Sequence, residues 1–227
     1  PVYRQGIHTM ERLVHTIVPD SSCNIWFGTY CGIIKYTPAS NNFNFYQNIE
    51  NDTTSLSNIT VRSICQLGDK MFFATEGGGL SVLDTASGKF ANYKNDPYDL
   101  NSISDDLVRV VYKDRENRIW IATTGGGINI IDPPNRDFSL FPNSKLNVVP
   151  ETRLESITIR ALCPADNGVI YVGSYSGLTI LNTKTNDVLQ LRKSYKIDNR
   201  NFNSHVYAIS RSIAGYYWVG MNDKLMK

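Results

Sequence analysis

The fold of this chain is decided by the stretch NRIWIATTGGGINIID, which covers residues 117–132. Large apolar residues alternate with other residues on both sides of three glycines, and this pattern predicts two antiparallel strands joined by a tight turn. A single hairpin has no core of its own and is marginally stable at best in water. The stretch therefore predicts that further copies of the same unit pack beside it.

Four more copies of the first strand of this hairpin occur along the chain, each centred on an aromatic residue. The five aromatic residues are Trp26, Phe72, Trp120, Tyr171 and Trp218. Successive members are 46, 48, 51 and 47 residues apart, a period that is typical of propeller blades rather than of helical or leucine-rich repeats. Because large aromatic side chains are usually buried, we expect all five to pack in the core between blades.

Each repeat has the pattern of four strands. In the second repeat, for example, they are expected at residues 61–65, 70–75, 80–84 and 90–93. A turn that contains glycine joins the second strand to the third, polar turns join the other pairs, and no stretch has helical periodicity. Since each unit must bury both faces against its neighbours, the sequence predicts an all-β protein, a β-propeller of four-stranded antiparallel blades with about four to five blades present.

The chain is interpreted as a single propeller segment, residues 1–227. The repeats are placed at residues 8–50, 56–97, 103–143, 156–194 and 203–227. Residues 1–5 resemble the fourth strand of another blade, so two architectures fit: a five-bladed ring that this strand closes, or part of a larger propeller. We favour the larger propeller because the chain stops at Met226-Lys227, where the other repeats continue to an Asp or Asn.

Composition and charge argue against several classes of partner. The chain has 23 basic and 21 acidic residues, a formal net charge of +2, so neither nucleic acid nor a membrane surface is expected as a partner. The longest apolar runs are far shorter than the roughly 20 residues that cross a bilayer, so we expect no direct membrane insertion. The four cysteines form no Cys-x-x-Cys pair and the three histidines have no ligand at metal spacing, so no metal and no cofactor are expected.

Residues 95–104 together with residues 117–128 resemble the two-component regulator propeller repeat. Residues 51–57 and 76–80 of the second repeat are also similar, whereas the fifth repeat lacks the turn glycine at residues 221–224. The resemblance implies a periplasmic ligand-sensing segment of a bacterial hybrid two-component protein. The parent would be anchored in the inner membrane, form a homodimer and carry a histidine kinase outside this chain.

Many sensors of this family respond to oligosaccharides, and their propellers commonly have seven blades. Seven blades of about 48 residues need about 340 residues, more than this chain has. The resemblance therefore supports the interpretation of the chain as part of a larger seven-bladed propeller.

The order of strands predicts which loops share one end of every blade. The turns between second and third strands lie at the same end as the loops that connect successive blades. These connecting loops are long, at residues 47–58, 94–105, 142–156 and 192–204. Because long loops on a rigid scaffold usually carry the binding site, we expect the ligand at this end, which we call the loop face.

The turns on the loop face carry residues of varied chemistry at one position of the repeat: Tyr30, Glu76, Thr124, Tyr175 and Asn222. Tyr98 lies in a neighbouring loop. We expect the tyrosines to stack on sugar faces and the other side chains to form hydrogen bonds with a small-molecule or oligosaccharide ligand. The alternative for each single position is an ordinary solvated turn residue.

An arginine recurs at one position of the first strand in three successive repeats: Arg62, Arg109 and Arg160. Three cations around one channel would hold an acidic sugar or a carboxylate by charge-assisted hydrogen bonds. The alternative is that each arginine pairs with a carboxylate or carbonyl of the next blade and closes the interface.

Signals for catalysis are weak. Residues 173–177 place no serine at the centre of a nucleophile elbow, and the Asn-Asp-Pro turn accounts for the pair Asp96 and Asp99. The leading hypothesis is a non-catalytic sensor module that binds a soluble ligand and signals to a kinase. The alternatives are a propeller lyase or glycosidase, which needs converging His or carboxylate groups, and a scaffold propeller, which needs an exposed apolar patch on the loop face.

Overall fold

The computed structural model describes residues 13–99, 102–131, 146–149, 158–182, 184–185, 188–191 and 205–227. Within these ranges the chain is all-β, apart from two short 3-10 helices, η2 (Pro38–Ser40) and η5 (Asp166–Gly168). This confirms the predicted fold class. No helix in the described ranges is long and apolar enough to cross a membrane.

The strands form five separate sheets, in each of which neighbouring strands are consecutive in sequence. The first sheet consists of β1 (Val14–Pro19), β2 (Ile25–Thr29), β3 (Gly32–Thr37) and β4 (Asn42–Tyr46). The second consists of β5 (Val61–Leu67), β6 (Lys70–Thr75), β7 (Leu80–Asp84) and β8 (Phe90–Tyr93). The third consists of β9 (Val108–Lys113), β10 (Ile119–Thr123), β11 (Ile128–Ile131) and β12 (Leu146–Val149).

The fourth sheet consists of β13 (Ile159–Pro164), β14 (Val169–Ser174), β15 (Gly177–Asn182) and β16 (Val188–Leu191). The fifth has three strands, β17 (Val206–Arg211), β18 (Tyr217–Met221) and β19 (Leu225–Met226). All pairs are antiparallel. The chain therefore builds five up-and-down units, the last with three strands among the described residues.

One strand differs from its predicted place. β12 lies within residues 142–156, which the sequence pattern assigns to a long loop, and it pairs in register with β11 from Leu146↔Ile131 to Val149↔Ile128. The free edge of β11 accepts a partner from any point along the chain that can reach it, so the connection between the two strands is longer here. The predicted outer strand at residues 1–5 and the loop at residues 192–204 lie outside the described residues.

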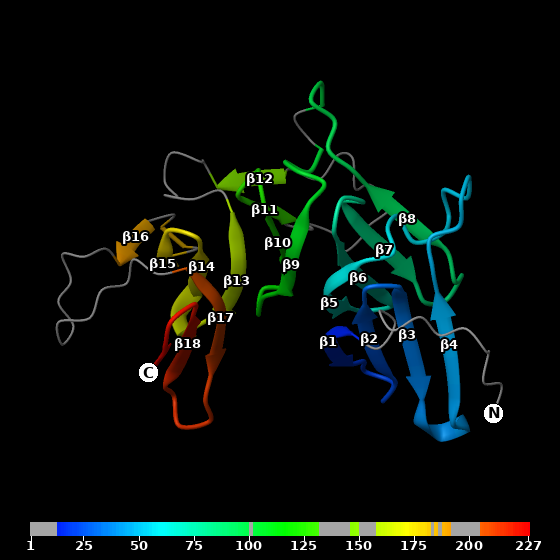
Figure 1. Cartoon of the computed structure of the whole chain (residues 1–227), viewed down its shortest axis with the longest axis horizontal. Helices are drawn as coiled ribbons and strands as arrows, with labels where there is room; N and C mark the ends of the chain where they lie inside the picture. The colour runs from blue at the N-terminus through cyan, green and yellow to red at the C-terminus, as the bar shows by residue number, and fades with distance from the viewer. Residues whose placement is uncertain are drawn as a thin grey trace.

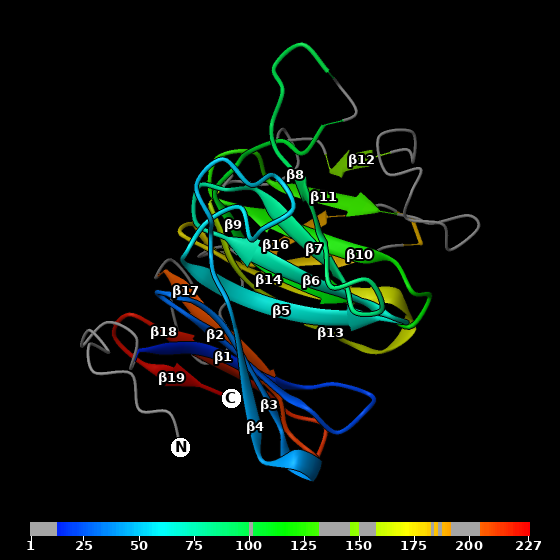
Figure 2. The same cartoon turned by 90° about the vertical axis from the view of Figure 1, so that its right-hand side faces the viewer.

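The five sheets follow one another around an arch, with the first and fifth sheets at its two ends (Figure 1). Figure 2 shows the arch from the side of the first and second sheets. The first strands of successive sheets contact each other in the order β1, β5, β9, β13 and β17. The arch leaves the first and fifth sheets apart, which supports part of a larger propeller rather than a closed five-bladed ring.

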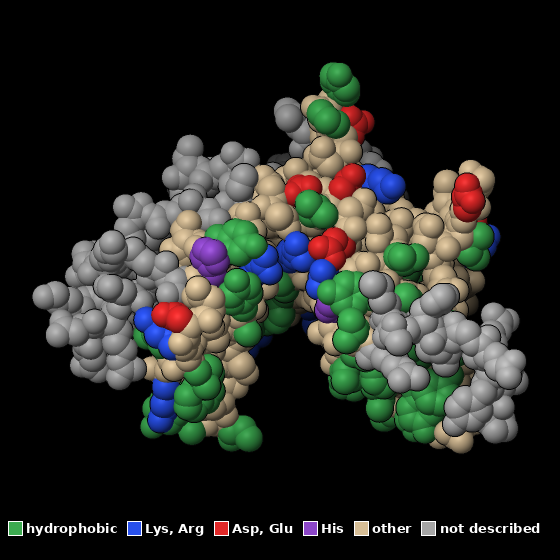
Figure 3. Space-filling view, viewed as in Figure 1, with side chains coloured by type: hydrophobic (Ala, Val, Ile, Leu, Met, Phe, Trp, Pro, Cys, Tyr) green, Lys and Arg blue, Asp and Glu red, His purple; other side chains and the backbone are tan. Residues whose placement is uncertain are grey.

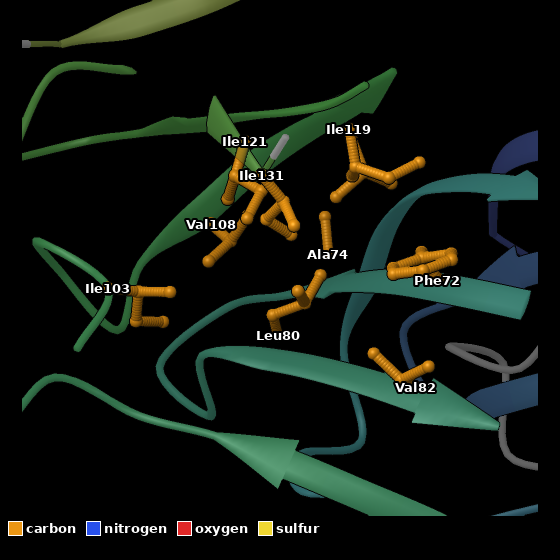
Figure 4. Packing of buried hydrophobic residues seen from close by; sticks show 10 residues of the cluster. Phe72, Ala74, Leu80, Val82, Ile103, Val108, Ile119, Ile121 and Ile131 are labelled. Atoms are coloured by element: carbon orange, nitrogen blue, oxygen red, sulfur yellow. The ribbon is translucent and has the colours of Figure 1, made fainter. Parts of the chain in front are cut away.

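Each interface between sheets buries apolar side chains from both partners. Figure 4 shows the interface of the second and third sheets, where Phe72 and Leu80 point toward Val108 and Ile119. Trp26 and Trp120 are buried in the same way at the interfaces on either side. The repeated aromatic residue of the second strand therefore packs against the following sheet, as predicted for these three blades.

The last two aromatic positions differ from the first three. Tyr171 is only partly buried against the fifth sheet. Trp218 is 38% exposed, which corrects the prediction that it is a core residue. It occupies the same register position on β18 as Trp120 on β10, but no sheet among the described residues follows the fifth one and covers this face.

An aspartate holds the tryptophan of two blades through the turn between the first and second strands. Asp114 accepts hydrogen bonds from the Glu116 and Arg118 backbone amides, from Arg118 Nε at 2.6 Å and from Trp120 Nε1 at 2.8 Å. Asp20 accepts an equivalent bond from Trp26 Nε1 at 2.7 Å. A buried indole N–H needs an acceptor, so the aspartate that orders the turn also satisfies the core.

We expect Asp114→Ala to lower the free energy of unfolding by about 2–4 kcal/mol, because it leaves the Trp120 indole and the Arg118 guanidinium without their buried acceptor. Urea unfolding followed by tryptophan fluorescence measures the loss. Asp69→Ala, in the corresponding turn of the second sheet, is the control and should change stability by less than about 0.5 kcal/mol. Equal effects of the two substitutions would contradict this role of Asp114.

A pH dependence is expected from Asp20. Burial by itself would raise the pKa of Asp20, but the hydrogen bonds from Trp26, Asn24 and Ser22 outweigh burial and hold the pKa below its ordinary value. The contribution of Asp20 to stability is therefore fully present above the unfolded-state pKa of about 3.9 and is lost as the pH falls through the lower folded value. Acid unfolding of Asp20→Asn should show a shallower loss of stability below about pH 4 than the parent chain. An unchanged acid slope would mean that the carboxylate of Asp20 is not linked to folding.

Candidate functional site

Every first strand carries one β-bulge at its loop-face end. Its pairing with the second strand skips a single residue in each of the five sheets. The skipped residues, which we call the bulge residues, are His15, Arg62, Arg109, Arg160 and Tyr207. A bulge leaves its residue outside the ladder and re-aims its side chain. Because the first strands line the inside of the arch, the bulge residues form a series along its inner margin.

The turns after the second strands lie next to the bulge residues, as the strand order predicts. Backbone hydrogen bonds join Glu76 N to Thr60 O at 3.0 Å, Thr124 N to Leu107 O at 2.9 Å and Tyr175 N to Thr158 O at 3.4 Å. In the second sheet this turn needs glycine at residue 79, whose φ is +75° and where a Cβ atom would lie 2.1 Å from Tyr93 O. The turn geometry thus places Glu76, Thr124 and Tyr175 over the bulge residues of their own sheets.

In the second and third sheets the arginines are paired. Arg62 donates from both Nε, at 2.8 Å, and Nη2 to Glu76 Oε2. Arg109 Nη1 lies 3.2 Å from Glu76 Oε1, and its Nε donates to Thr124 Oγ1 at 3.0 Å. One carboxylate therefore pairs with two guanidinium groups and links neighbouring sheets, because Glu76 follows β6 whereas Arg109 belongs to β9.

At the first sheet the series begins with an aromatic contact. The rings of His15 and Tyr30 lie 4.2 Å apart, His15 Nδ1 is 3.3 Å from Arg62 Nη1, and the Arg62 guanidinium lies over the Tyr30 ring at 5.2 Å. Burial lowers the pKa of His15, and the neighbouring Arg62 cation lowers it further. His15 Nε2 is buried and has no hydrogen-bond partner, so a neutral imidazole fits this position.

At the fourth and fifth sheets a different cluster forms. The Arg160 guanidinium lies 4.5 Å from the centre of the Tyr175 ring and 5.1 Å from that of Tyr207, and its Nη2 donates to the Tyr175 hydroxyl. The rings of Tyr175 and His205 are 4.5 Å apart. Arg160 Nε is buried and has no hydrogen-bond partner among the described residues. We call Arg160, Tyr175, His205 and Tyr207 the Arg160 cluster.

Figure 3 shows basic, acidic and histidine side chains gathered along the inner margin of the arch. Most of the predicted residues come together in two groups: a connected series of Tyr30, Arg62, Glu76, Arg109 and Thr124, and the Arg160 cluster with Arg160 and Tyr175.

Two predicted residues lie apart from these contacts. Asn222 is exposed and joined to His205 O by its backbone amide at 3.3 Å, and Tyr98 is 97% exposed in the segment between β8 and β9 that projects from the arch (Figure 1).

Sequence reasoning missed three members of the site: His15, His205 and Tyr207. The signal was present, because His15 and Tyr207 occupy the position of Arg62 when the first strands are aligned on Val14, Val61 and Val206. The position was not recognised in the first and fifth repeats because only the arginines recur as one residue type. The position matters more than the residue type, since the bulge points whatever occupies it toward the inside of the arch.

Other chemistry is not supported by the described residues. No group of three or more His, Cys, Asp or Glu side chains in these ranges is arranged to hold a metal ion, and all four cysteines are free thiols. A groove at the opposite end of the blades, between the third and fourth sheets, is lined in part by Asp114, Arg118 and Lys184. Asp114 and Arg118 are already bonded to each other at 2.6 Å, so the varied polar groups of the loop face form the better candidate site.

Residues 102–125 match the family model described as the two component regulator propeller. This match confirms the resemblance predicted from the third repeat. A comparison with curated proteins gives no match.

Several solved structures have a similar fold. One is the extracellular domain of a protein assigned as a hybrid two component system from B. thetaiotaomicron, with 20% identity and a TM-score of 0.76 over 94% of this chain and 28% of that chain. Another, from the same organism, is the extracellular domain of a protein assigned as a one component system, with 17% identity and a TM-score of 0.61 over 94% of this chain and 31% of that chain. A catalytically inactive virginiamycin B lyase from Staphylococcus aureus has 13% identity and a TM-score of 0.64 over 94% of this chain and 68% of that chain.

The chain spans less than a third of the length of the two extracellular domains. At these identities the likeness concerns the fold, which the extracellular domains of these signalling systems share with lyases. Together with the arch of four-stranded sheets, the family match identifies this chain as a β-propeller segment that carries a two component regulator propeller repeat.

Proposed function

We propose that this chain is a non-catalytic sensing module that binds a soluble oligosaccharide at the bulge and turn residues and signals to a histidine kinase outside the chain. The observation that carries the proposal is the recurrence of the bulge in all five sheets. The same backbone bulge in each sheet places five side chains of three residue types along the inner margin of the arch. Constant geometry with variable chemistry is how a recognition site is placed on a repeated scaffold.

The residues at this margin suit a sugar ligand. Tyr175 and Tyr207 are 38% and 44% exposed, so their rings offer apolar faces on which a pyranose ring can stack. Half-buried donors and acceptors that can form hydrogen bonds with sugar hydroxyl groups come from Arg62, Glu76, Arg109 and Thr124. A site with a few placed polar groups beside aromatic faces is typical of small-ligand recognition.

The cellular setting is part of the proposal. The similar extracellular domains support a periplasmic position, and the resemblance to the repeat family implies a homodimeric parent that is anchored in the inner membrane. Ligand binding would signal by favouring one of two arrangements of the domains or of the dimer, because a ligand shifts an equilibrium only through its different affinity for two states.

The proposal is tested by calorimetry of the 227-residue chain against a panel of neutral and acidic oligosaccharides. We expect at least one member to bind, and Tyr207→Ala to weaken its binding about tenfold because a stacking face is lost. Tyr216→Ala is the matched control. Tyr216 is 52% exposed on the same sheet but precedes β18, at the end away from the bulge.

The absence of binding across the panel would overturn the proposed ligand class. Equal losses from Tyr207→Ala and Tyr216→Ala would show that the ligand binds elsewhere on the fifth sheet. Binding of a protein partner to the apolar side chains that the first sheet exposes, among them Ile17 and Phe45, would instead favour a scaffold propeller.

A lyase or glycosidase is the second candidate, because similar propellers include lyases and the site contains His15 and His205. Mass spectrometry of the bound oligosaccharide after long incubation distinguishes the two. A sensor releases its ligand unchanged. Turnover that is abolished by Glu76→Gln or Asp96→Asn would establish catalysis and replace the sensor proposal.

A further inference from the structure

Only one of two adjacent donors of the Arg160 guanidinium, Nη2 and not Nε, forms a hydrogen bond with a residue that the structure describes. An arginine presents Nε–H and one Nη–H side by side, as a fork that matches the two oxygens of a carboxylate. In Arg160 the Nη2 donates to the Tyr175 hydroxyl, whereas Nε is buried and has no acceptor among the residues that the structure describes. The Tyr175 hydroxyl oxygen therefore accepts from one of the two adjacent donors and leaves the other without a hydrogen bond in this part of the chain.

The second sheet shows the same fork when it is filled. Arg62 is the bulge residue there, and its Nε and Nη2 both donate to one oxygen, Oε2, of the Glu76 carboxylate at the turn position. In the fourth sheet the same two positions hold Arg160 and Tyr175. The described residues thus build one arginine fork that holds a carboxylate and a second fork, at the same bulge and turn positions, that holds none.

The second fork also has no acidic partner among the residues that the structure describes. Arg62 and Arg109 share Glu76, but Arg160 forms no ion pair with any residue that the structure describes. Its cationic group is held by the Tyr175 and Tyr207 rings. Aromatic faces position a guanidinium but do not neutralise it, and leaving a charged donor buried without an acceptor is costly.

We propose that the Arg160 cluster is a subsite for the carboxylate of an acidic sugar, such as a uronic acid residue. The ligand carboxylate takes the place that Glu76 has in the second sheet: it accepts from Nε and Nη2 of Arg160 and displaces the Tyr175 hydroxyl. The Tyr207 ring remains as a stacking face beside the charged group. This inference rests on the proposed function, because it names the ligand class for the same loop face.

The subsite can be tested without knowing the whole ligand. The buried Nε–H of Arg160 gives a side-chain signal in ¹⁵N-labelled chain, which Arg160→Lys identifies by its disappearance. Sodium glucuronate is titrated at constant ionic strength, with glucose as the neutral probe of the same ring. We expect a saturable shift of the Arg160 Nε–H signal with glucuronate and none with glucose.

Three variants make the test specific. Tyr175→Glu supplies an internal carboxylate and copies the second sheet, so it should weaken glucuronate binding by roughly tenfold or more. Arg115→Met removes an exposed cation at the opposite end of the blades and should leave the titration unchanged. Tyr175→Phe keeps the ring but removes the competing hydroxyl, so glucuronate should bind at least as tightly as to the parent chain.

The results separate this inference from the proposed function. If neutral oligosaccharides of the panel bind while glucuronate leaves the Arg160 signal unmoved, the carboxylate subsite is wrong and the sensing proposal stands. If glucuronate moves the signal but no oligosaccharide binds, the subsite stands and the oligosaccharide proposal is wrong. A shift that persists in full in Tyr175→Glu would overturn the displacement that we infer.

Discussion

The structure depends on one constraint: every four-stranded sheet has two apolar faces, and each face must be covered by a neighbouring sheet. Phe72 and Ile119 meet across one such interface, and Trp26 and Trp120 are buried at the two beside it. Sheets that pack face to face in succession cannot form a flat stack, because their twist turns each one relative to the last. The arch in Figure 1 is the result.

The arch gives the first strands a distinct role. Their outer neighbours complete each sheet, while their loop-face ends converge on the inner margin, where the packing of the core no longer dictates the side chains. The bulge uses this freedom: it takes one residue out of the ladder in every sheet and points it inward. Core and site residues therefore lie on the same strand, but packing selects the core residues whereas the bulge residues are free of that requirement. This explains why Val61 is buried beside the polar Arg62.

Much of the fold was predictable from local signals. The spacing of the aromatic residues gave the five units, the glycine turns gave the hairpins, and the turn residues Tyr30, Glu76, Thr124 and Tyr175 do lie beside the first strands. The predictions that differ all depend on distant partners. Trp218 is exposed because burial requires a following sheet, and β12 forms because the edge of β11 finds a strand farther along the chain.

The sequence by itself determined the repeating unit, because strand alternation and turn chemistry are properties of neighbouring residues. It also marked Arg62, Arg109 and Arg160 as equivalent. Only the tertiary structure decided that these three cations differ, since their partners lie apart in the chain: Glu76 pairs with Arg62 and Arg109, while Arg160 contacts the rings of Tyr175 and Tyr207. These contacts join residues that are distant in the sequence, so no local pattern encodes them. They distinguish Arg62, whose Nε and Nη2 bind a carboxylate, from Arg160, whose Nε has no acceptor among the described residues.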